Sequence, residues 1–206
     1  MGCAPAELVT GPRVTVRRRR PGDSAALHRV VVDALPHLIP WMSWAGPGYD
    51  LATARAQGGR AEQAWADRTA FAYVLETGGA LVGALELWHQ PGGIMELGYW
   101  LHPAHTGRGL VTEAAGLLVE QAFTLPEVAA VEIWHDAANT ASAAVPRRLA
   151  FTEVARSTPP REPMSPGEVG VDVVWRITRP CDRPGVTRAA RLPSPEQDGT
   201  RPGGQT

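Results

Sequence analysis

Residues 96–110 read Glu-Leu-Gly-Tyr-Trp-Leu-His-Pro-Ala-His-Thr-Gly-Arg-Gly-Leu, and this stretch decides the fold of the chain. Its first half is apolar enough for a buried strand, a proline turn follows, and Gly107-Arg108-Gly109 opens a helix. The first N–H groups of a helix have no partner within it and carry the positive end of its dipole. Glycine lets backbone approach an anion closely, so the turn fits a pyrophosphate. A tight turn alone accounts for the same two glycines equally well.

Strands and helices alternate on both sides of this stretch. Val14 and Val16 indicate a first strand, a Thr-Gly-Gly-Ala turn joins two later strands into a hairpin, and stripes of apolar residues mark the helices. We expect Asp23 to cap the first helix, and Pro36 and Pro40 to break it. The pattern predicts an α/β chain with one mixed sheet. The expected strands are residues 13–18, 71–76, 81–88, 94–101, 128–134, a run around Val154 and 171–177, and the expected helices begin near residues 24, 51, 110 and 139.

Length and composition exclude several classes of protein. With 206 residues and a net charge of −1, the chain is expected to form one domain and not a nucleic-acid-binding module. No apolar run approaches the length of a membrane span, which favours a soluble, cytoplasmic protein. All 20 basic residues are arginine. The run Arg17 to Arg20 is either a basic patch for nucleic acid or, as we favour, the solvated end of the first strand.

The two ends of the sequence lack apolar patterning. We expect residues 1–12 and the Pro-, Gly- and Arg-rich residues 180–206 to be disordered tails around a domain of residues 13–179. The two cysteines, Cys3 and Cys181, fall in these tails, so neither a disulfide scaffold nor a metal site is expected.

Two further segments support the central stretch. Asn139-Thr140-Ala141-Ser142 follows a predicted strand, and residues 37–44 read His-Leu-Ile-Pro-Trp-Met-Ser-Trp. Together with residues 96–110, these segments resemble the GCN5-related N-acetyltransferase (GNAT) superfamily, and within it the RimJ/RimL-like branch. The resemblance covers residues 13–179. It implies a mixed, mostly antiparallel sheet of about seven strands flanked by about four helices, with the strands at 94–101 and 128–134 splayed apart.

The resemblance also implies an activity, the direct transfer of the acetyl group of acetyl-CoA to a primary amine. The acceptor is either a protein N-terminal α-amine or a small-molecule amine, and the alternative is a non-catalytic acyl-CoA-binding sensor with the same fold. Residues that match the family pattern are catalytic Glu96 and Ser142; acetyl-CoA-binding Leu101, His105, Thr106, Gly107, Arg108, Gly109, Leu110, Asn139 and Ser142; and acceptor-binding His37, Trp41 and Trp44.

Structural roles compete with these assignments. Glu96 is equally well explained as a rim or ion-paired residue, Asn139 and Ser142 as helix-capping residues, and the tryptophans as packing residues. Three positions depart from the family pattern: Ala104 replaces a basic or amide residue, Ala150 replaces the glycine of the usual Leu-Gly-Phe, and Pro146 should kink the last helix. The sequence leaves the oligomeric state open, including a homodimer.

Overall fold

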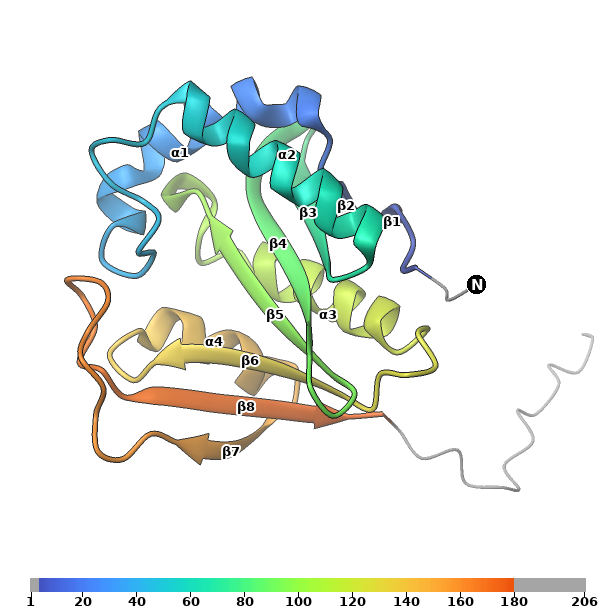
Figure 1. Ribbon diagram of the computed structural model, residues 1–206, viewed down its shortest axis with the longest axis vertical. Helices are drawn as coiled ribbons and strands as arrows, with labels where there is room; N and C mark the ends of the chain where they lie inside the picture. Colours follow the sequence, from blue (N-terminus) through green and yellow to red (C-terminus); the bar gives the residue numbers. More distant parts are fainter. Residues whose placement is uncertain (1–3, 180–206) are drawn as a thin grey trace, which may run out of the picture.

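The computed structural model describes residues 4–179 and contains one sheet of eight strands in the order β1-β2-β3-β4-β5-β6-β8-β7 (Figure 1). Neighbouring strands are antiparallel except β5 and β6, which are parallel. The strands are β1 (Leu8–Thr10), β2 (Thr15–Arg18), β3 (Ala70–Thr77), β4 (Ala80–Gln90), β5 (Ile94–Leu101), β6 (Ala130–Asp136), β7 (Thr152–Arg156) and β8 (Asp172–Thr178).

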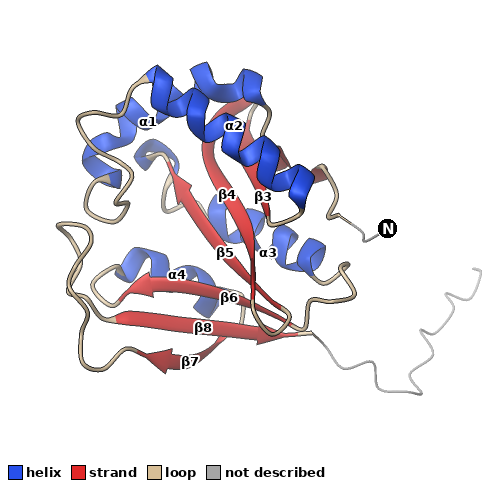
Figure 2. Ribbon diagram, in the orientation of Figure 1, coloured by secondary structure: helices blue, strands red, loops and turns tan. Residues whose placement is uncertain are grey.

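Four α-helices cover the sheet, with α1 and α2 on one face and α3 and α4 on the other (Figures 1 and 2). Their bounds are α1 (Ser24–Leu38), α2 (Leu51–Asp67), α3 (Leu110–Ala122) and α4 (Thr140–Arg148). Alternate residues of the central strands, such as Leu85, Leu87 and Leu97, are buried in one core with the apolar stripe of α3. The predicted mixed, mostly antiparallel fold is confirmed.

The eighth strand lies where the sequence suggested a disordered tail. Residues 8–10 pair with β2, and the Tyr73 hydroxyl donates to the carbonyl oxygen of Ala6 at 2.9 Å. The expectation of disorder over residues 1–12 is therefore wrong for the part that the structure describes. A strand of three residues is too short to show an alternating pattern, and its pairing comes from β2. The other predicted tail, residues 180–206, lies outside the described residues.

The first helix begins where it was predicted but differs in its cap and at its end. Asp23 is the N-cap residue, but its carboxylate binds the Arg17 guanidinium at 2.8–2.9 Å and accepts from the backbone N–H of Arg20 at 2.7 Å instead of capping the first turn. Pro36 lies inside α1, which continues to Leu38. Pro36 is exposed, and the helix ends two residues after it.

Helix α2 contains two adjacent glycines with opposite surroundings. A Cβ atom on Gly58 would lie 2.8 Å from the Ser24 hydroxyl oxygen, whereas a Cβ on Gly59 would meet nothing within 4 Å. Alanine in a helix interior is favoured over glycine by roughly 0.5–1 kcal/mol. We therefore expect Gly59→Ala to raise the free energy of unfolding by about this amount, and Gly58→Ala to lower it by about 1 kcal/mol through overpacking. Urea denaturation of both variants measures the difference, and equal stabilisation by both would contradict the tight α1–α2 contact.

Strands β5 and β6 separate soon after they begin. Only three residue pairs join them, ending at Glu96 and Glu132, whereas β5 pairs with β4 over its whole length. Beyond Glu96 the two strands diverge (Figure 1). The structure thus contains the fork that the sequence predicted, and Glu96 stands at its base.

Candidate active site

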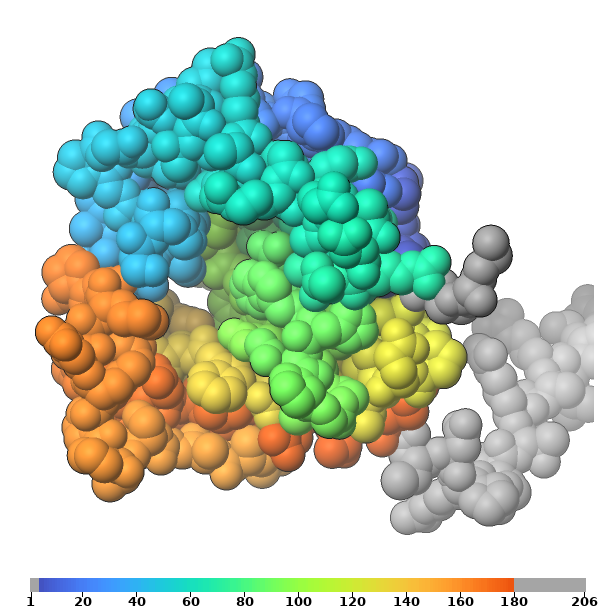
Figure 3. All heavy atoms as spheres, viewed as in Figure 1, coloured from blue at the N-terminus to red at the C-terminus, as the bar shows by residue number. Residues whose placement is uncertain are grey.

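A cavity of about 1100 Å³ opens over the fork on the α1–α2 face of the sheet. Its lining includes Glu96 and Tyr99 from β5, Asn139 and Ser142 beside β6, and the aromatic segment between α1 and α2. Figure 3 shows the opening between this segment and the β7–β8 loop, residues 157–171. The predicted catalytic residues Glu96 and Ser142 therefore line one space.

Glu96 is a half-buried carboxylate at the base of the fork. Burial raises the pKa of its carboxyl, the Gln90 amide that donates to it at 2.9 Å opposes the rise, and the negative charge of Glu132 adds to it. Glu132 is its partner across the fork, and Nε of Arg176 donates to that carboxylate at 2.7 Å. A carboxylate with a raised pKa is a better proton acceptor at neutral pH than an exposed one.

Hydrogen bonds link Ser142 to Tyr99, and a proline in α4 makes one of them possible. Pro146 has no N–H to donate to the carbonyl of Ser142, four residues earlier in α4. The Tyr99 hydroxyl donates to that carbonyl at 3.1 Å and also lies 3.1 Å from the Ser142 hydroxyl oxygen. Burial strongly raises the pKa of Tyr99, so its hydroxyl stays protonated. The proline thus connects the two hydroxyl groups across the fork, a role that the sequence analysis missed although the four-residue spacing could have indicated it.

Asn139 is the N-cap of α4. Its side-chain oxygen accepts from the backbone N–H of Ser142 at 3.0 Å. Asn139 also lines the cavity, and no hydrogen bond within residues 4–179 uses its side-chain amide nitrogen. The capping role is real and is compatible with contact to a ligand in the fork.

Two of the three predicted acceptor-binding residues lie at the cavity and one does not. Trp41 and Trp44 line it, and the Trp44 ring packs against Trp100 and Tyr49 with centroid separations of 6.3 and 5.7 Å. His37 is exposed in the last turn of α1 and is not part of the lining. The assignment of His37 to the acceptor site is corrected, because the helix continues through Pro36 and turns that side chain outward.

The glycine turn before α3 presents free backbone donors. Among the described residues, no hydrogen bond satisfies the backbone N–H groups of residues 107–112, and the hydroxyl oxygen of Thr112 is buried without a partner. Gly107 and Gly109 both have φ of +74°, and a Cβ on Gly107 would meet nothing within 4 Å. Free N–H groups at a helix start are suited to bind a diphosphate. Of the predicted acetyl-CoA-binding residues, Asn139 and Ser142 line the cavity, whereas the turn lies outside its lining.

Arg13 holds the glycine turn in place. From the sequence, this residue was expected only to begin the first strand. The Arg13 side chain donates to Glu113 at 2.7 Å and to the carbonyl oxygen of Arg108 at 2.7 Å. Burial, Arg108 and His102 lower the pKa of His105, which keeps its imidazole neutral at pH 7. The free backbone N–H groups and the charge of Arg108 are therefore the groups of this turn that could bind an anion.

The arginine run is divided between the surface and the cavity. Arg17, Arg18 and Arg20 form ion pairs with carboxylates at 2.5–2.8 Å, so their charges are largely neutralised. Arg19 turns inward and lines the cavity. The pairing favours the structural role of the run over a nucleic-acid patch.

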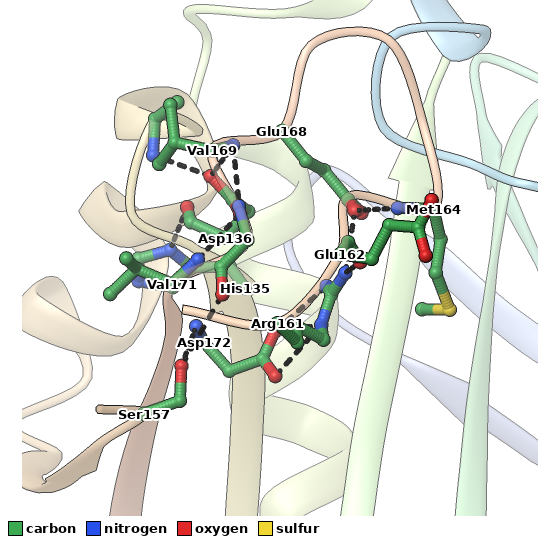
Figure 4. Close-up of polar contacts among 12 residues, drawn as sticks. His135, Asp136, Ser157, Arg161, Glu162, Met164, Glu168, Val169, Val171 and Asp172 are labelled. Carbon is green, nitrogen blue, oxygen red and sulfur yellow. Dashed lines mark hydrogen bonds and ion pairs between the residues drawn. The ribbon is translucent and has the colours of Figure 1, made fainter. Parts of the chain in front are cut away.

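The β7–β8 loop is fixed to the end of β6 by Asp136 (Figure 4). Its buried carboxylate accepts from the backbone N–H groups of Ala138, Val169, Gly170 and Val171 at 2.8–3.2 Å. Burial opposes ionisation, but these four hydrogen bonds outweigh it and hold the pKa of Asp136 below its usual value. The sequence analysis did not single out this residue.

Arg161 and Gly167 complete the far rim of the cavity. From the loop, Arg161 binds Asp172 at the start of β8 at 2.8 Å and Glu168 of the loop at 2.9 Å (Figure 4). The backbone N–H of Gly167 donates to the carbonyl oxygen of Pro40 at 3.0 Å, and a Cβ there would lie 2.7 Å from that oxygen. The β7–β8 loop thus touches the α1–α2 segment and closes the rim.

The sequence profile of the acetyltransferase (GNAT) domain matches residues 13–152 of the chain. The chain belongs to the GNAT family. It is an acetyl-CoA-dependent N-acetyltransferase, as the resemblance implied. Within residues 4–179, none of its helices has the length and apolar character needed to cross a bilayer.

Relatives of this GNAT protein include ribosomal-protein acetyltransferases. It is 28% identical over 146 residues to the putative ribosomal N-acetyltransferase YdaF of Bacillus subtilis (strain 168), covering 68% of this chain and 78% of that one. Its fold is similar to that of RimL, a ribosomal L7/L12 α-N-protein acetyltransferase solved with coenzyme A, with a TM-score of 0.77, 18% identity, and coverage of 84% and 98%. RimJ of Mycobacterium smegmatis, solved with CoA-disulfide, gives a TM-score of 0.72 at 24% identity, with coverage of 85% and 86%.

The glycine turn gives a direct test of acetyl-CoA placement. Gly107→Val puts a β-branched residue at φ +74° and crowds the free N–H groups, so we expect the Kd for acetyl-CoA to rise at least about tenfold. Gly92→Val is the matched control, because Gly92 has φ of +80° and equally open surroundings in the β4–β5 turn. Calorimetry should show weakened binding only for Gly107→Val. Equal affinities in two folded variants would reject this turn as the diphosphate site.

Proposed function

We propose that this enzyme acetylates the α-amine at the N-terminus of a protein, with Glu96 accepting the amine proton and Ser142 serving the leaving thiolate. The observation that carries the proposal is the position of Glu96 at the base of the fork, in one cavity with Ser142. RimL is described as an α-N-protein acetyltransferase of ribosomal L7/L12, and a similar acetyltransferase of Salmonella typhimurium as modifying the N-terminal serine of that protein, which supports the same acceptor class here. We also propose a cytoplasmic location, where acetyl-CoA and new protein N-termini both occur.

The reaction is a direct transfer with a balanced set of bonds. The neutral amine nitrogen attacks the thioester carbonyl carbon, the new N–C bond forms, and the C–S bond breaks. The amine proton passes to Glu96, directly or through water, and the CoA thiolate takes a proton from the Ser142 hydroxyl, which is then reprotonated from solvent. The diphosphate would lie on the N–H groups of residues 107–112, and the arm of CoA would pass Asn139.

The weak basicity of Glu96 suits an α-amine. At pH about 7.4, an α-amine of pKa 7.7–8.0 is roughly a quarter neutral, whereas deprotonating a lysine of pKa 10.4 costs about 4 kcal/mol. A carboxylate whose pKa is raised by burial is adequate for the first case and insufficient for the second. The chemistry therefore favours α-amines over lysine side chains.

The proposal is tested with one peptide in two forms. A peptide with a free α-amine and one internal lysine is compared with the same peptide whose α-amine is formylated, and acetylation is followed by CoA release and mass spectrometry. We expect one acetyl group on the free α-amine and none on the formylated peptide. Acetylation of the lysine would reject the acceptor class. Tight acetyl-CoA binding without turnover on any amine would instead favour a non-catalytic acyl-CoA sensor.

A further inference from the structure

Arg19 and Glu86 are two charged side chains in the cavity that the acetyl-transfer step does not use. Arg19 follows β2, and its backbone N–H donates to the carbonyl oxygen of Ala72 in β3 at 2.8 Å. Glu86 lies on β4 and Glu96 on β5, on the same face of the sheet, because Glu86 pairs with Gly98, two residues from Glu96. The three charged groups therefore follow one another across the sheet, away from the fork.

Both side chains lack ionic partners among the described residues. Arg19, unlike its neighbours in the arginine run, forms no ion pair; its Nη2 donates to the carbonyl oxygen of Ala54 at 3.2 Å, and its Nε is buried without a partner. Burial lowers the pKa of Arg19 and raises that of Glu86, although each charge favours the other. Within residues 4–179, Glu86 accepts no hydrogen bond, and no ion pair within 4.0 Å joins it to Arg19. Nε of Arg19 is removed from water without a partner, which is costly, and Glu86 is half-buried beside the cavity, so a ligand that supplies partners to them would be bound favourably.

The floor between these charges is made of small residues. Ala72, Ala84 and Gly98 line it, and a Cβ on Gly98 would lie 2.6 Å from the ring of Trp88. Neighbouring strands are about 4.8 Å apart. At the backbone, Glu86 therefore lies roughly 5–10 Å from Glu96, on the adjacent strand, and Arg19 lies roughly 15 Å from it, three strands from β5. A ligand that fits must carry a hydrogen-bond donor and then an acceptor at these distances from its amine. A polypeptide main chain has this alternation.

We propose that Glu86 and Arg19 bind the first peptide units of a polypeptide acceptor. Glu86 accepts from the N–H of the acceptor's second residue, and Arg19 donates to a carbonyl oxygen that follows. The inference rests on the proposed N-terminal acetylation and adds to it the groups by which a chain end is selected over a small amine. Both are specificity-determining residues and take no part in proton transfer.

The test uses a tripeptide amide and its analogue with an ester in place of the first peptide bond. The ester lacks the N–H that Glu86 would accept, so the wild-type KM should rise about tenfold with kcat nearly unchanged. In Glu86→Ala the two acceptors should have nearly equal KM, because the partner of that N–H is gone. Arg19→Met should raise the KM for the tripeptide about tenfold and leave the KM for phenethylamine, which has no peptide unit, unchanged.

Control variants distinguish a loss of peptide binding from misfolding and from a failure of the proposed N-terminal acetylation. Arg55→Met removes an exposed arginine of α2 that does not line the cavity and should change neither KM. Unchanged acetyl-CoA affinity by calorimetry, together with the isosteric variant Glu86→Gln, excludes loss of the fold. If peptides are acetylated but the ester penalty persists in Glu86→Ala, the pair is not the peptide-binding site and N-terminal acetylation still stands. Acetylation of phenethylamine alone would overturn both proposals.

Discussion

Glu96→Gln should lower kcat for an N-terminal peptide by about a hundredfold, the low end of what a general base contributes. The effect is limited because an α-amine is already partly neutral near pH 7.4. The acetyl-CoA affinity should not change, because Glu96 lies at the base of the fork and not at the glycine turn. Stopped-time assays of CoA release, with Glu120→Gln on the exposed face of α3 as the matched control, measure the loss.

The pH dependence of the same variant distinguishes a base from a structural residue. The pKa of Glu96 is raised in the folded protein, so wild-type activity should fall as pH drops through that raised value. In Glu96→Gln only the titration of the amine remains. For stability the sign is opposite: a raised folded pKa contributes stability that is present below the unfolded pKa and lost as pH rises through the folded one. The variant should therefore be at least as stable as the wild type at pH 7, and a less stable variant with an unchanged pH profile would contradict the role of base.

Asp136→Ala should lower the free energy of unfolding by about 3 kcal/mol, because it leaves four backbone N–H groups without their charged acceptor. For a domain of this size the melting temperature should fall by roughly 6–12 °C. Asp136→Asn keeps one acceptor oxygen and should lose less. Asp67→Ala, at the exposed end of α2, is the control and should change stability by no more than about 0.5 kcal/mol.

The pH dependence of that loss follows from the lowered pKa of Asp136. A carboxyl whose folded pKa is lowered contributes stability above its unfolded pKa, about 3.9, and loses it as pH falls through the folded value. The difference between wild type and Asp136→Ala should therefore be constant at neutral pH and shrink below about pH 4. The acceptor KM should also rise in the variant, because the β7–β8 loop forms one rim of the cavity. Thermal melts unchanged by the substitution would show that the loop is held by other contacts.

Patterns local in sequence predicted most of this fold. The hairpin of β3 and β4, the stripe of α3 and the glycine turn before it each depend on neighbouring residues, and each lies where it was expected. Strand β1 was missed because three residues carry no periodicity and are specified by their pairing with β2.

The candidate site also divides into residues that local sequence patterns predict and residues that only the fold brings together. Glu96, Ser142 and Asn139 were identified from a motif, whereas Tyr99 and Asp136 act through residues more than thirty positions away. Arg19 could not be separated from its three neighbours in the sequence, because only the fold determines which arginine turns inward. His37 was misassigned for a related reason, since a helix that continues past Pro36 changes the direction of the next side chain.

The contact between Gly167 and Pro40 gives the cavity the topology of a ring (Figure 3). An acceptor cannot be laid into a ring sideways; it has to be inserted by a free end and withdrawn along the same path. A slender, unfolded chain terminus meets this requirement, and an amine in the middle of a folded surface does not. Selection of chain ends would then be enforced by geometry before any side chain of the acceptor is recognised. The strength of the hydrogen bond from Gly167 to Pro40 would then determine how strictly the cavity selects chain ends.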